Sequence, residues 1–288
     1  MNTLQNTYIN ALLADAVYVK ELNNKLSSKS LTALLTERMT YTQAQYIADN
    51  FEVLAVKETD DWIKSGFDAV IWRGKENGIA AGKIFVSLRG TEGAQDFITD
   101  VDLALSVAAR GQIIDMVNWW NQVVTPTNQM AAQIKEVGAD SNLSSKPNML
   151  EFRFVEKSDS VKGLGILVSD EGANLSVTVN GHSLGGHLAG AFARLFQDSI
   201  QIDEVNTFNG AGFLSTGEFF FKQIETALSL EPTKFYTPQN NYFAAHGINV
   251  TTNDWWFKQI GSRQPIFNEE GTTVPNHSPT PCGNSANI

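Results

Sequence analysis

The first fifty residues carry apolar side chains at the spacing of a helix. They recur every three or four residues at Leu4, Tyr8, Leu12, Ala16 and Val19, and a second such pattern covers residues 41–48. This spacing keeps the apolar groups on one face of a 3.6-residue turn, which predicts amphipathic helices. We therefore expect residues 1–50 to form an N-terminal helical layer.

Short apolar runs follow this layer and are typical of strands. The early runs cover 51–56, 67–72 and 83–88, and the later ones cover 175–179, 204–208 and residues near 234–237. Most are bounded by Gly, Asn or charged residues, and runs of this length and composition predict buried strands. Helical patterns separate them, at 96–137, 160–172, 184–197 and 217–228, with a polar surface loop expected at 138–147.

This alternation of strand and helix, with glycine at the strand ends, sets the expected fold class. It predicts an α/β fold with a mainly parallel central sheet flanked by helices. After Ile260 the chain is rich in Pro, Asn, Gly and Ser. We expect residues 262–288 to be an irregular C-terminal loop and tail.

Composition favours one large domain spanning residues 1–288. The chain has 288 residues, of which 42% are hydrophobic and 18% are charged, enough for a substantial core. The formal net charge of −10 disfavours a nucleic-acid partner and gives no attraction to an anionic membrane. Any membrane contact would therefore have to be apolar.

No targeting segment is recognisable in the chain. The N-terminus lacks the basic region of a signal peptide, and no apolar run is long enough to form a transmembrane segment. We expect a cytoplasmic protein or one exported unprocessed, with secretion weakly favoured. The single cysteine, Cys282, excludes an internal disulfide and is interpreted as an exposed bystander.

The segment Gly181-His-Ser-Leu-Gly-Gly186 lies between the apolar run 175–179 and a helical pattern. A serine nucleophile must be exposed, given a base and placed beside oxyanion donors. A Gly-x-Ser-x-Gly turn from strand to helix meets the first need, because it projects the hydroxyl of Ser183 outwards. The helix start points N–H groups at the same place, and the N–H of Leu184 is the expected first oxyanion donor.

Two ordered motifs resemble the class 3 lipases, an α/β-hydrolase-related family. The segment VTVNGHSLGGHLAGAFARLF, residues 177–196, is similar to the elbow of that family. The segment FVSLRGT, residues 85–91, followed by Asp96-Phe97 and Asp100, is similar to its strand-end motif. The resemblance covers roughly residues 80–280 and implies that Thr91 supplies the other oxyanion donor, through its backbone N–H and hydroxyl. The turn at 209–213 departs from the family's Gly-x-Pro-Arg pattern, which leaves the shape of the acyl pocket open.

The four histidines restrict the choice of a general base. His182 lies inside the elbow and His187 lies on the following helix, and both are interpreted as packing or hydrogen-bonding residues. The α/β-hydrolase order of Ser, acid and His leaves His246 and His277. A loop can carry an imidazole over the strand ends, so we favour His277 over His246, which reads as part of a strand.

The acid of the triad is sought between the elbow and the base. The aspartates in that interval are Asp198, Asp203 and Asp254. The first two flank the far end of the elbow helix, which leaves Asp254, in a segment similar to the Asp-containing segment of bacterial lipases with this elbow. Glu269 and Glu270 remain alternative acids, and an ordinary solvated Asp254 is the alternative without function.

Residues 103–124 contain more apolar side chains than one helix face normally buries. One interpretation is a lid or interfacial segment over the acyl site, and the alternative is a core helix. Trp255 and Trp256 directly follow Asp254 in the sequence. They could contact lipid, but we favour a role in anchoring Asp254.

These residues and the resemblance together predict a serine carboxylic-ester hydrolase, specifically a triacylglycerol lipase acting on a lipid or ester substrate with transient contact to a lipid interface. A phospholipase A1 and a lidless esterase use the same triad and stay as alternatives, as does a non-catalytic hydrolase-like binding module. No cofactor is expected, because this chemistry needs none. No metal is expected either, because the His and Cys spacing does not fit zinc and calcium-binding nonapeptide repeats are absent.

Overall fold

A computed structural model describes residues 3–59, 65–90, 101–138, 153–168, 175–213, 218–230, 237–245 and 260–266. Within these ranges, side chains are described for all residues except 101–108, 138 and 153. The description therefore covers the predicted elbow and most of the predicted strands.

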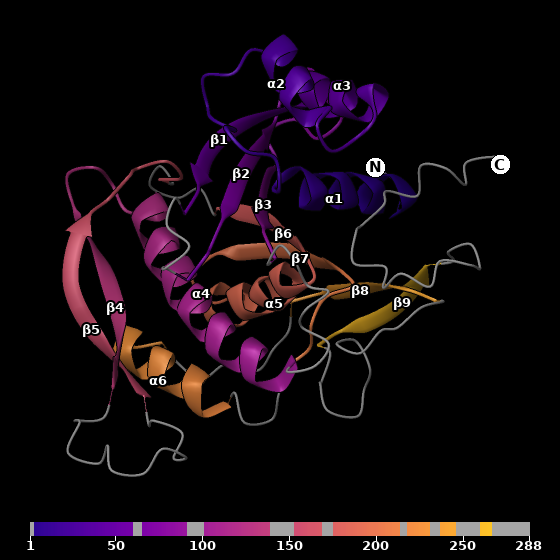
Figure 1. Cartoon of the computed structure of the whole chain (residues 1–288). Helices are drawn as coiled ribbons and strands as arrows, with labels where there is room; N and C mark the ends of the chain where they lie inside the picture. The colour runs from indigo at the N-terminus through magenta and orange to yellow at the C-terminus, as the bar shows by residue number, and fades with distance from the viewer. Residues whose placement is uncertain are drawn as a thin grey trace.

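Seven described strands form one sheet, in the order β1-β2-β3-β6-β7-β8-β9 (Figure 1). They are β1 Phe51–Lys57, β2 Ala69–Gly74, β3 Ile84–Leu88, β6 Ser176–His182, β7 Gln201–Phe208, β8 Gln239–Ala244 and β9 Ser262–Ile266. β1 and β2 pair antiparallel, as do β2 and β3, and every pairing from β3 to β9 is parallel. The predicted α/β class, with a mainly parallel sheet flanked by helices, is confirmed.

The N-terminal layer consists of α1 Thr3–Ala16, α2 Ser28–Leu35 and α3 Tyr41–Asn50. Ser27 caps α2, and Thr40 with Gln43 forms a capping box at the start of α3, which satisfies N–H groups that have no partner within the helix. The layer buries Leu12, Leu35 and Ile47 against one face of the sheet. The predicted helical layer is confirmed for these segments.

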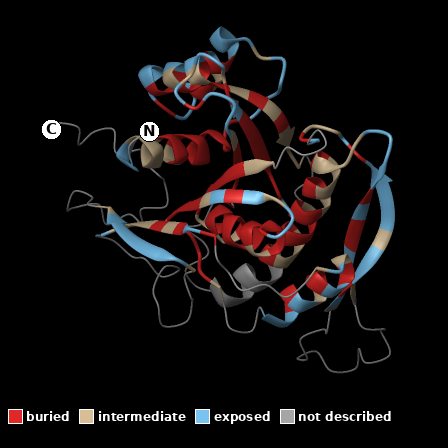
Figure 2. Ribbon diagram, turned by 180° about the vertical axis from the view of Figure 1, so that it is seen from behind, coloured by how far each residue is buried: buried red, intermediate tan, exposed pale blue. Residues whose placement is uncertain are grey.

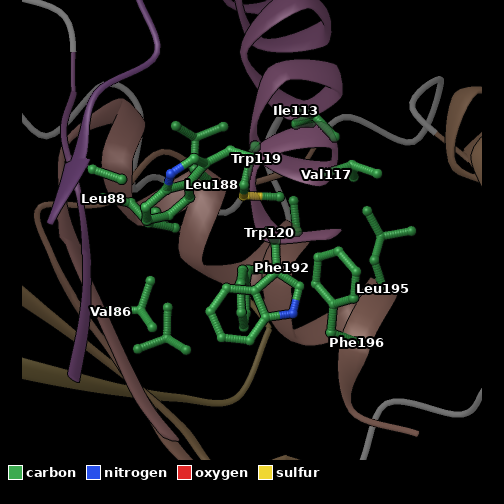
Figure 3. Packing of buried hydrophobic residues seen from close by; sticks show 14 of the residues in the cluster. Val86, Leu88, Ile113, Val117, Trp119, Trp120, Leu188, Phe192, Leu195 and Phe196 are labelled. Carbon is green, nitrogen blue, oxygen red and sulfur yellow. The ribbon is translucent and has the colours of Figure 1, made fainter. Parts of the chain in front are cut away.

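The other face of the sheet is covered by α4 Val101–Val124 and α5 Leu184–Phe196, and α6 Glu218–Leu228 packs outside them. Valines of the central strands alternate to this side and meet the aromatic side chains of α4 and α5 (Figure 3). Trp120 contacts Phe192 edge to face, with ring centroids 4.7 Å apart. Figure 2 shows this interior as a continuous buried region.

A hairpin of β4 Met130–Gly138 and β5 Arg153–Lys162 packs on α4 and α6 and forms a second, two-stranded sheet. Two predictions were wrong here. Residues 130–137 were expected to be helical, and residues 160–162 were expected to begin a helix. The sequence of β4 is rich in helix-forming residues, but pairing with β5 buries Ala131 and Ile134 and so determines the strand.

The C-terminal part of the sheet also differs from the prediction. Residues 234–236 of the strand expected near 234–237 lie outside the described residues, and the described strand in this region, β8, begins at Gln239. Residues 262–266, expected to belong to an irregular tail, form β9, whose exposed sequence Ser-Arg-Gln-Pro-Ile has no alternating apolar pattern. β9 is specified instead by its backbone hydrogen bonds to β8. The Ala245 N–H also donates to the Ile266 carbonyl over 2.8 Å. Pro265 therefore presents its nitrogen to the outer edge of the sheet.

The lid interpretation of residues 103–124 is not supported for 109–124. These residues belong to α4, and its side chains Ile113, Met116, Val117, Trp120 and Val123 are buried in the core. The core-helix alternative therefore describes this part, and the side chains of 103–108 lie outside the described residues. Within the described part of the chain, none of the helices combines the length and apolar character needed to cross a bilayer.

Candidate active site

Ser183 lies at the turn between β6 and α5, as the sequence predicted. Its backbone has φ 55° and ψ −124°, a conformation that non-glycine residues rarely adopt. The Ser183 N–H donates to the Phe208 carbonyl over 3.0 Å, and its own carbonyl accepts from Gly186 at 3.0 Å and Ala211 at 3.1 Å. The turn is therefore held by hydrogen bonds to the end of β7, to the segment that follows β7 and to the first turn of α5.

The glycines of this turn are required by close backbone approach. A Cβ at Gly181 would overlap the carbonyl of Gly185, and a Cβ at Gly185 would overlap the carbonyl of Leu88 at the end of β3. A Cβ at Gly186 would come 2.7 Å from the Cα of Gly210. Strand and helix can therefore meet at this distance only with glycine at these positions.

The Ser183 side chain lies directly before the start of α5. The residue is half-buried and its side chain does not cap α5. Leu184, the predicted oxyanion donor, is the first residue of the helix and its side chain is buried. The first N–H groups of a helix have no acceptor within the helix and carry the positive end of its dipole, so an anion is favoured beside Ser183.

The end of β3 lies against this turn. Leu88 is in register with Gly181, and a Cβ at Gly90 would come 2.7 Å from the carbonyl oxygen of His182. Thr91, the other predicted oxyanion residue, lies outside the described residues and follows Gly90 directly in the chain. The structure therefore brings the start of the predicted oxyanion segment beside the elbow.

A buried tyrosine at this junction was missed from the sequence. The hydroxyl of Tyr18 accepts the Gly90 N–H at 3.1 Å and shares a hydrogen bond with Nδ1 of His182 at 3.2 Å. Burial raises the pKa of Tyr18 to about 12, opposed mainly by the bond from Gly90, so the phenol stays protonated near neutral pH. Tyr18 is distant in sequence from both partners, and no spacing signal could have found it.

Charged side chains also hold the end of β3. Arg89 forms an ion pair with Asp68, and the Asp68 carboxylate also accepts the Thr59 N–H at 2.7 Å. Lys20 lies 3.6 Å from the same carboxylate. Arg89 and Asp68 are both buried, so this pair fixes the strand end rather than presenting charge to a substrate.

His187 and His182 both make the packing and hydrogen-bond contacts expected of them. Nδ1 of His187 lies 3.0 Å from the Gly212 carbonyl, and the ring packs on Phe213 with centroids 4.3 Å apart. Desolvation lowers the pKa of His187 to about 4, opposed by the bond to Gly212, so the imidazole is neutral at pH 7.

The remaining predicted site residues are not all placed. Asp254 and His277 lie outside the described residues, as do the alternatives His246, Glu269 and Glu270. Asp198 follows the C-terminal end of α5, and Asp203 lies in the first half of β7. Both are therefore at the opposite edge of the sheet from Ser183, as expected.

No protein-family model matches the chain, and no curated protein matches it. Among solved structures, the chain is similar to the Lip2 lipase from Yarrowia lipolytica, with 14% sequence identity and a TM-score of 0.46. The similarity covers 92% of this chain and 78% of that chain. Values this low do not assign an activity to this chain.

Proposed function

We propose that the chain is a serine carboxylic-ester hydrolase that cleaves lipid acyl esters, as a triacylglycerol lipase does, through an acyl-enzyme intermediate. The observation that carries the proposal is Ser183 itself, a non-glycine residue held at φ 55° between a parallel strand and a helix. Backbone strain of this kind persists only where the surrounding structure holds it, and it is the geometry that exposes a nucleophilic serine.

In the proposed reaction, Oγ of Ser183 attacks the ester carbonyl while His277 accepts the hydroxyl proton. The tetrahedral intermediate collapses, the C–O bond to the alcohol breaks, and His277 returns the proton to the departing alcohol. Water then attacks the acyl-enzyme, giving a proton to His277 that returns to Ser183 as the acid leaves. Asp254 orients the imidazole and stabilises its charged form.

The oxyanion formed in each step needs donors aimed at it. Leu184 lies at the start of α5, and Gly90 brings the chain beside the elbow one residue before Thr91. The proposal therefore assigns the oxyanion to the N–H groups of Leu184 and Thr91, with the Thr91 hydroxyl in support. Loss of one such donor typically costs about 10²–10³-fold in kcat.

The placement of the triad partners is supported by topology. β8 and β9 run parallel to β6, so their carboxyl ends lie at the edge where β6 delivers Ser183. The segment with Asp254 leaves from the carboxyl end of β8, and the segment with His277 leaves from that of β9. Ligand and catalytic groups of open α/β sheets gather at this edge.

An esterase acting on dispersed short-chain esters is the second candidate. The observation that favours it is the burial of residues 109–124 in the core, which removes that part of α4 from a lid. A phospholipase A1 would use the same serine on bilayers, and a non-catalytic binding module would hold its ligand without chemistry at the serine.

The test measures fatty-acid release from emulsified triglyceride, phosphatidylcholine vesicles and short p-nitrophenyl esters. We expect Ser183→Ala to lower kcat by at least about 10⁴-fold, because a triad nucleophile is removed. Ser199→Ala is the matched control, because the Ser199 hydroxyl donates only to the Phe196 carbonyl, after the far end of α5. Preference for short esters would select the esterase, and preference for phosphatidylcholine would select the phospholipase. No turnover of any ester, together with no labelling by a fluorophosphonate, would leave the binding module.

A further inference from the structure

Three segments far apart in the sequence meet at the hydroxyl of Tyr18. Tyr18 lies in the turn after α1, Gly90 lies beyond the end of β3, and His182 is the last residue of β6. The Gly90 N–H donates to the hydroxyl, and Nδ1 of His182 shares a hydrogen bond with it. One oxygen atom therefore connects the residue before Thr91 to the residue before Ser183.

This connection begins where the pairing between β3 and β6 stops. The register of β3 with β6 ends at the pair Leu88 and Gly181, so Gly90 and His182 lie beyond the last paired residues. A backbone N–H that is buried without an acceptor is costly, and the Tyr18 hydroxyl is the acceptor for Gly90. The Tyr18 side chain, from the turn after α1, therefore links the two strand ends beyond the point where the β3–β6 ladder stops.

The ring of Tyr18 is itself held in place. The residue is 8% exposed, and the guanidinium of Arg38 lies 4.3 Å from the ring centroid. Arg38 is fixed in turn by Asp15, with its Nε 2.7 Å from Oδ1. Arg89 lies 5.4 Å from the ring centroid. Contacts of cations with aromatic faces are attractive, so the ring and its hydroxyl have a fixed direction.

We propose that Tyr18 is a positioning residue that sets the separation between the strand end leading to Thr91 and the nucleophile elbow. This inference rests on the proposed function, because it assigns Tyr18 a role in placing the oxyanion donors. Tyr18 itself touches neither the substrate nor the reacting atoms.

A change in the separation of the oxyanion donors from the elbow should affect the transition state more than substrate binding. Donor positions are most critical in the transition state, when charge develops on the carbonyl oxygen, and contribute less to ground-state binding. Misplacement by about 1 Å can cost on the order of 10²-fold in rate. Loss of the Tyr18 hydroxyl should therefore lower kcat and leave KM nearly unchanged.

The test compares Tyr18→Phe with Tyr46→Phe, using kcat and KM on a short p-nitrophenyl ester and the rate of inactivation by a fluorophosphonate. Tyr18→Phe keeps the ring and removes the hydroxyl. Tyr46 is the matched control, because its hydroxyl is bonded to Gln5 within the N-terminal layer, away from the elbow. We expect Tyr18→Phe to lower kcat about 10–100-fold with KM within about twofold, to slow inactivation in parallel, and to leave the shape of the pH profile intact. We expect Tyr46→Phe to match the wild type.

Each outcome has a defined meaning. Wild-type kcat in folded Tyr18→Phe, or a loss matching only the unfolded fraction from its melting curve, overturns the positioning role while the esterase activity stands. A wild type that neither turns over esters nor reacts with the fluorophosphonate overturns the proposed function, and the inference with it. Should Tyr18→Phe be unfolded at the assay temperature, His182→Asn removes the same connection from its other end, and the same split between kcat and KM is expected.

Discussion

The two faces of the central sheet bury different chemistry from the same strands. Towards α5, the middle strands present Val86, Val177, Val179 and Val205, all fully buried among apolar neighbours. Towards α1, the adjacent positions of the same strands are Ser87, Thr178, Asn180 and Asn206, and these are also buried. At these positions of the middle strands, alternation therefore places apolar side chains towards α5 and polar ones towards α1.

The polar side chains facing α1 lie in register with one another across neighbouring strands. Ser87, Asn180, Asn206 and Asn240 are successive register partners across four strands, and Asn180 donates to Oδ1 of Asn10 in α1 at 3.1 Å. Thr7 of α1 also bonds the hydroxyl of Tyr242 at 2.9 Å. Apolar burial is non-directional, whereas these bonds form in only one register. The bonds on the α1 side therefore fix where α1, and hence Tyr18, is placed.

We expect the largest loss of stability from a substitution on the apolar side of the sheet. Trp120→Ala should lower the free energy of unfolding by about 3–5 kcal/mol, because Trp120 is 1% exposed and its removal leaves a cavity beside Phe192. Urea unfolding followed by circular dichroism measures the change. Phe219→Ala is the control, since Phe219 is 57% exposed, and its effect should be within about 0.5 kcal/mol. Equal effects of the two variants would contradict the assignment of this core.

We expect the next largest effect on the free energy of unfolding from acidification, through protonation of His187. Its pKa in the folded protein, about 4, lies below the ordinary 6.5, so its contribution to stability is fully present above pH 6.5 and is lost as the pH falls towards 4. The full difference would correspond to between roughly 3 and 4 kcal/mol, and the partial exposure of His187 lowers this contribution. His187→Gln should therefore flatten the decline of unfolding free energy between pH 7 and pH 4, measured by urea unfolding at each pH.

Asp15, on the polar side, provides a control of opposite sign. Burial raises its pKa above 3.8, opposed by the charge and hydrogen bond of Arg38. A carboxyl with a raised pKa stabilises the fold when protonated, and this contribution is lost as the pH rises through the folded-state pKa. Asp15→Asn should therefore steepen the decline on acidification. A variant of His187 with the wild-type pH dependence would show that its imidazole is not desolvated.

The smallest expected effect is on the polar face. Asn10→Ala should lower the unfolding free energy by about 1–2 kcal/mol, because Asn180 loses a buried acceptor. Asn23→Ala is the matched control and should have little effect, because the two bonds it removes, to the Glu21 carbonyl and from the Lys25 N–H, are both exposed. If Asn10→Ala cost as much as Trp120→Ala, the division of roles between the faces would not hold.

The parts of the fold that sequence predicted were those specified locally. The strands β1, β3 and β6, the helix α5 and the turn at Ser183 each carry their own signal in apolar spacing or glycine position. The hairpin did not, because residues 130–137 favour a helix until β5 covers them. β9 did not either, because its five residues become a strand only beside β8.

The candidate site divides in the same way. Ser183 and Leu184 were found from one continuous motif, and the structure places both at the expected turn. Tyr18 and Asp68 were missed because their contacts with Gly90 and Arg89 cross long stretches of sequence and carry no periodic pattern. Asp254, His277 and Thr91 stay predictions. Contacts between distant segments depend on tertiary structure, which spacing along one chain does not encode.

The proline in β9 has a consequence for encounters between copies of the chain. β1 and β9 are the outermost strands of the described sheet, and outermost strands can recruit foreign strands through their open backbone groups. Pro265 offers no N–H on the outward side, and β1 carries an irregular register between Val53 and Ala55. An incoming strand would meet a missing donor on one flank and a kinked partner on the other. Both features disfavour pairing with an incoming strand at these edges of the described sheet.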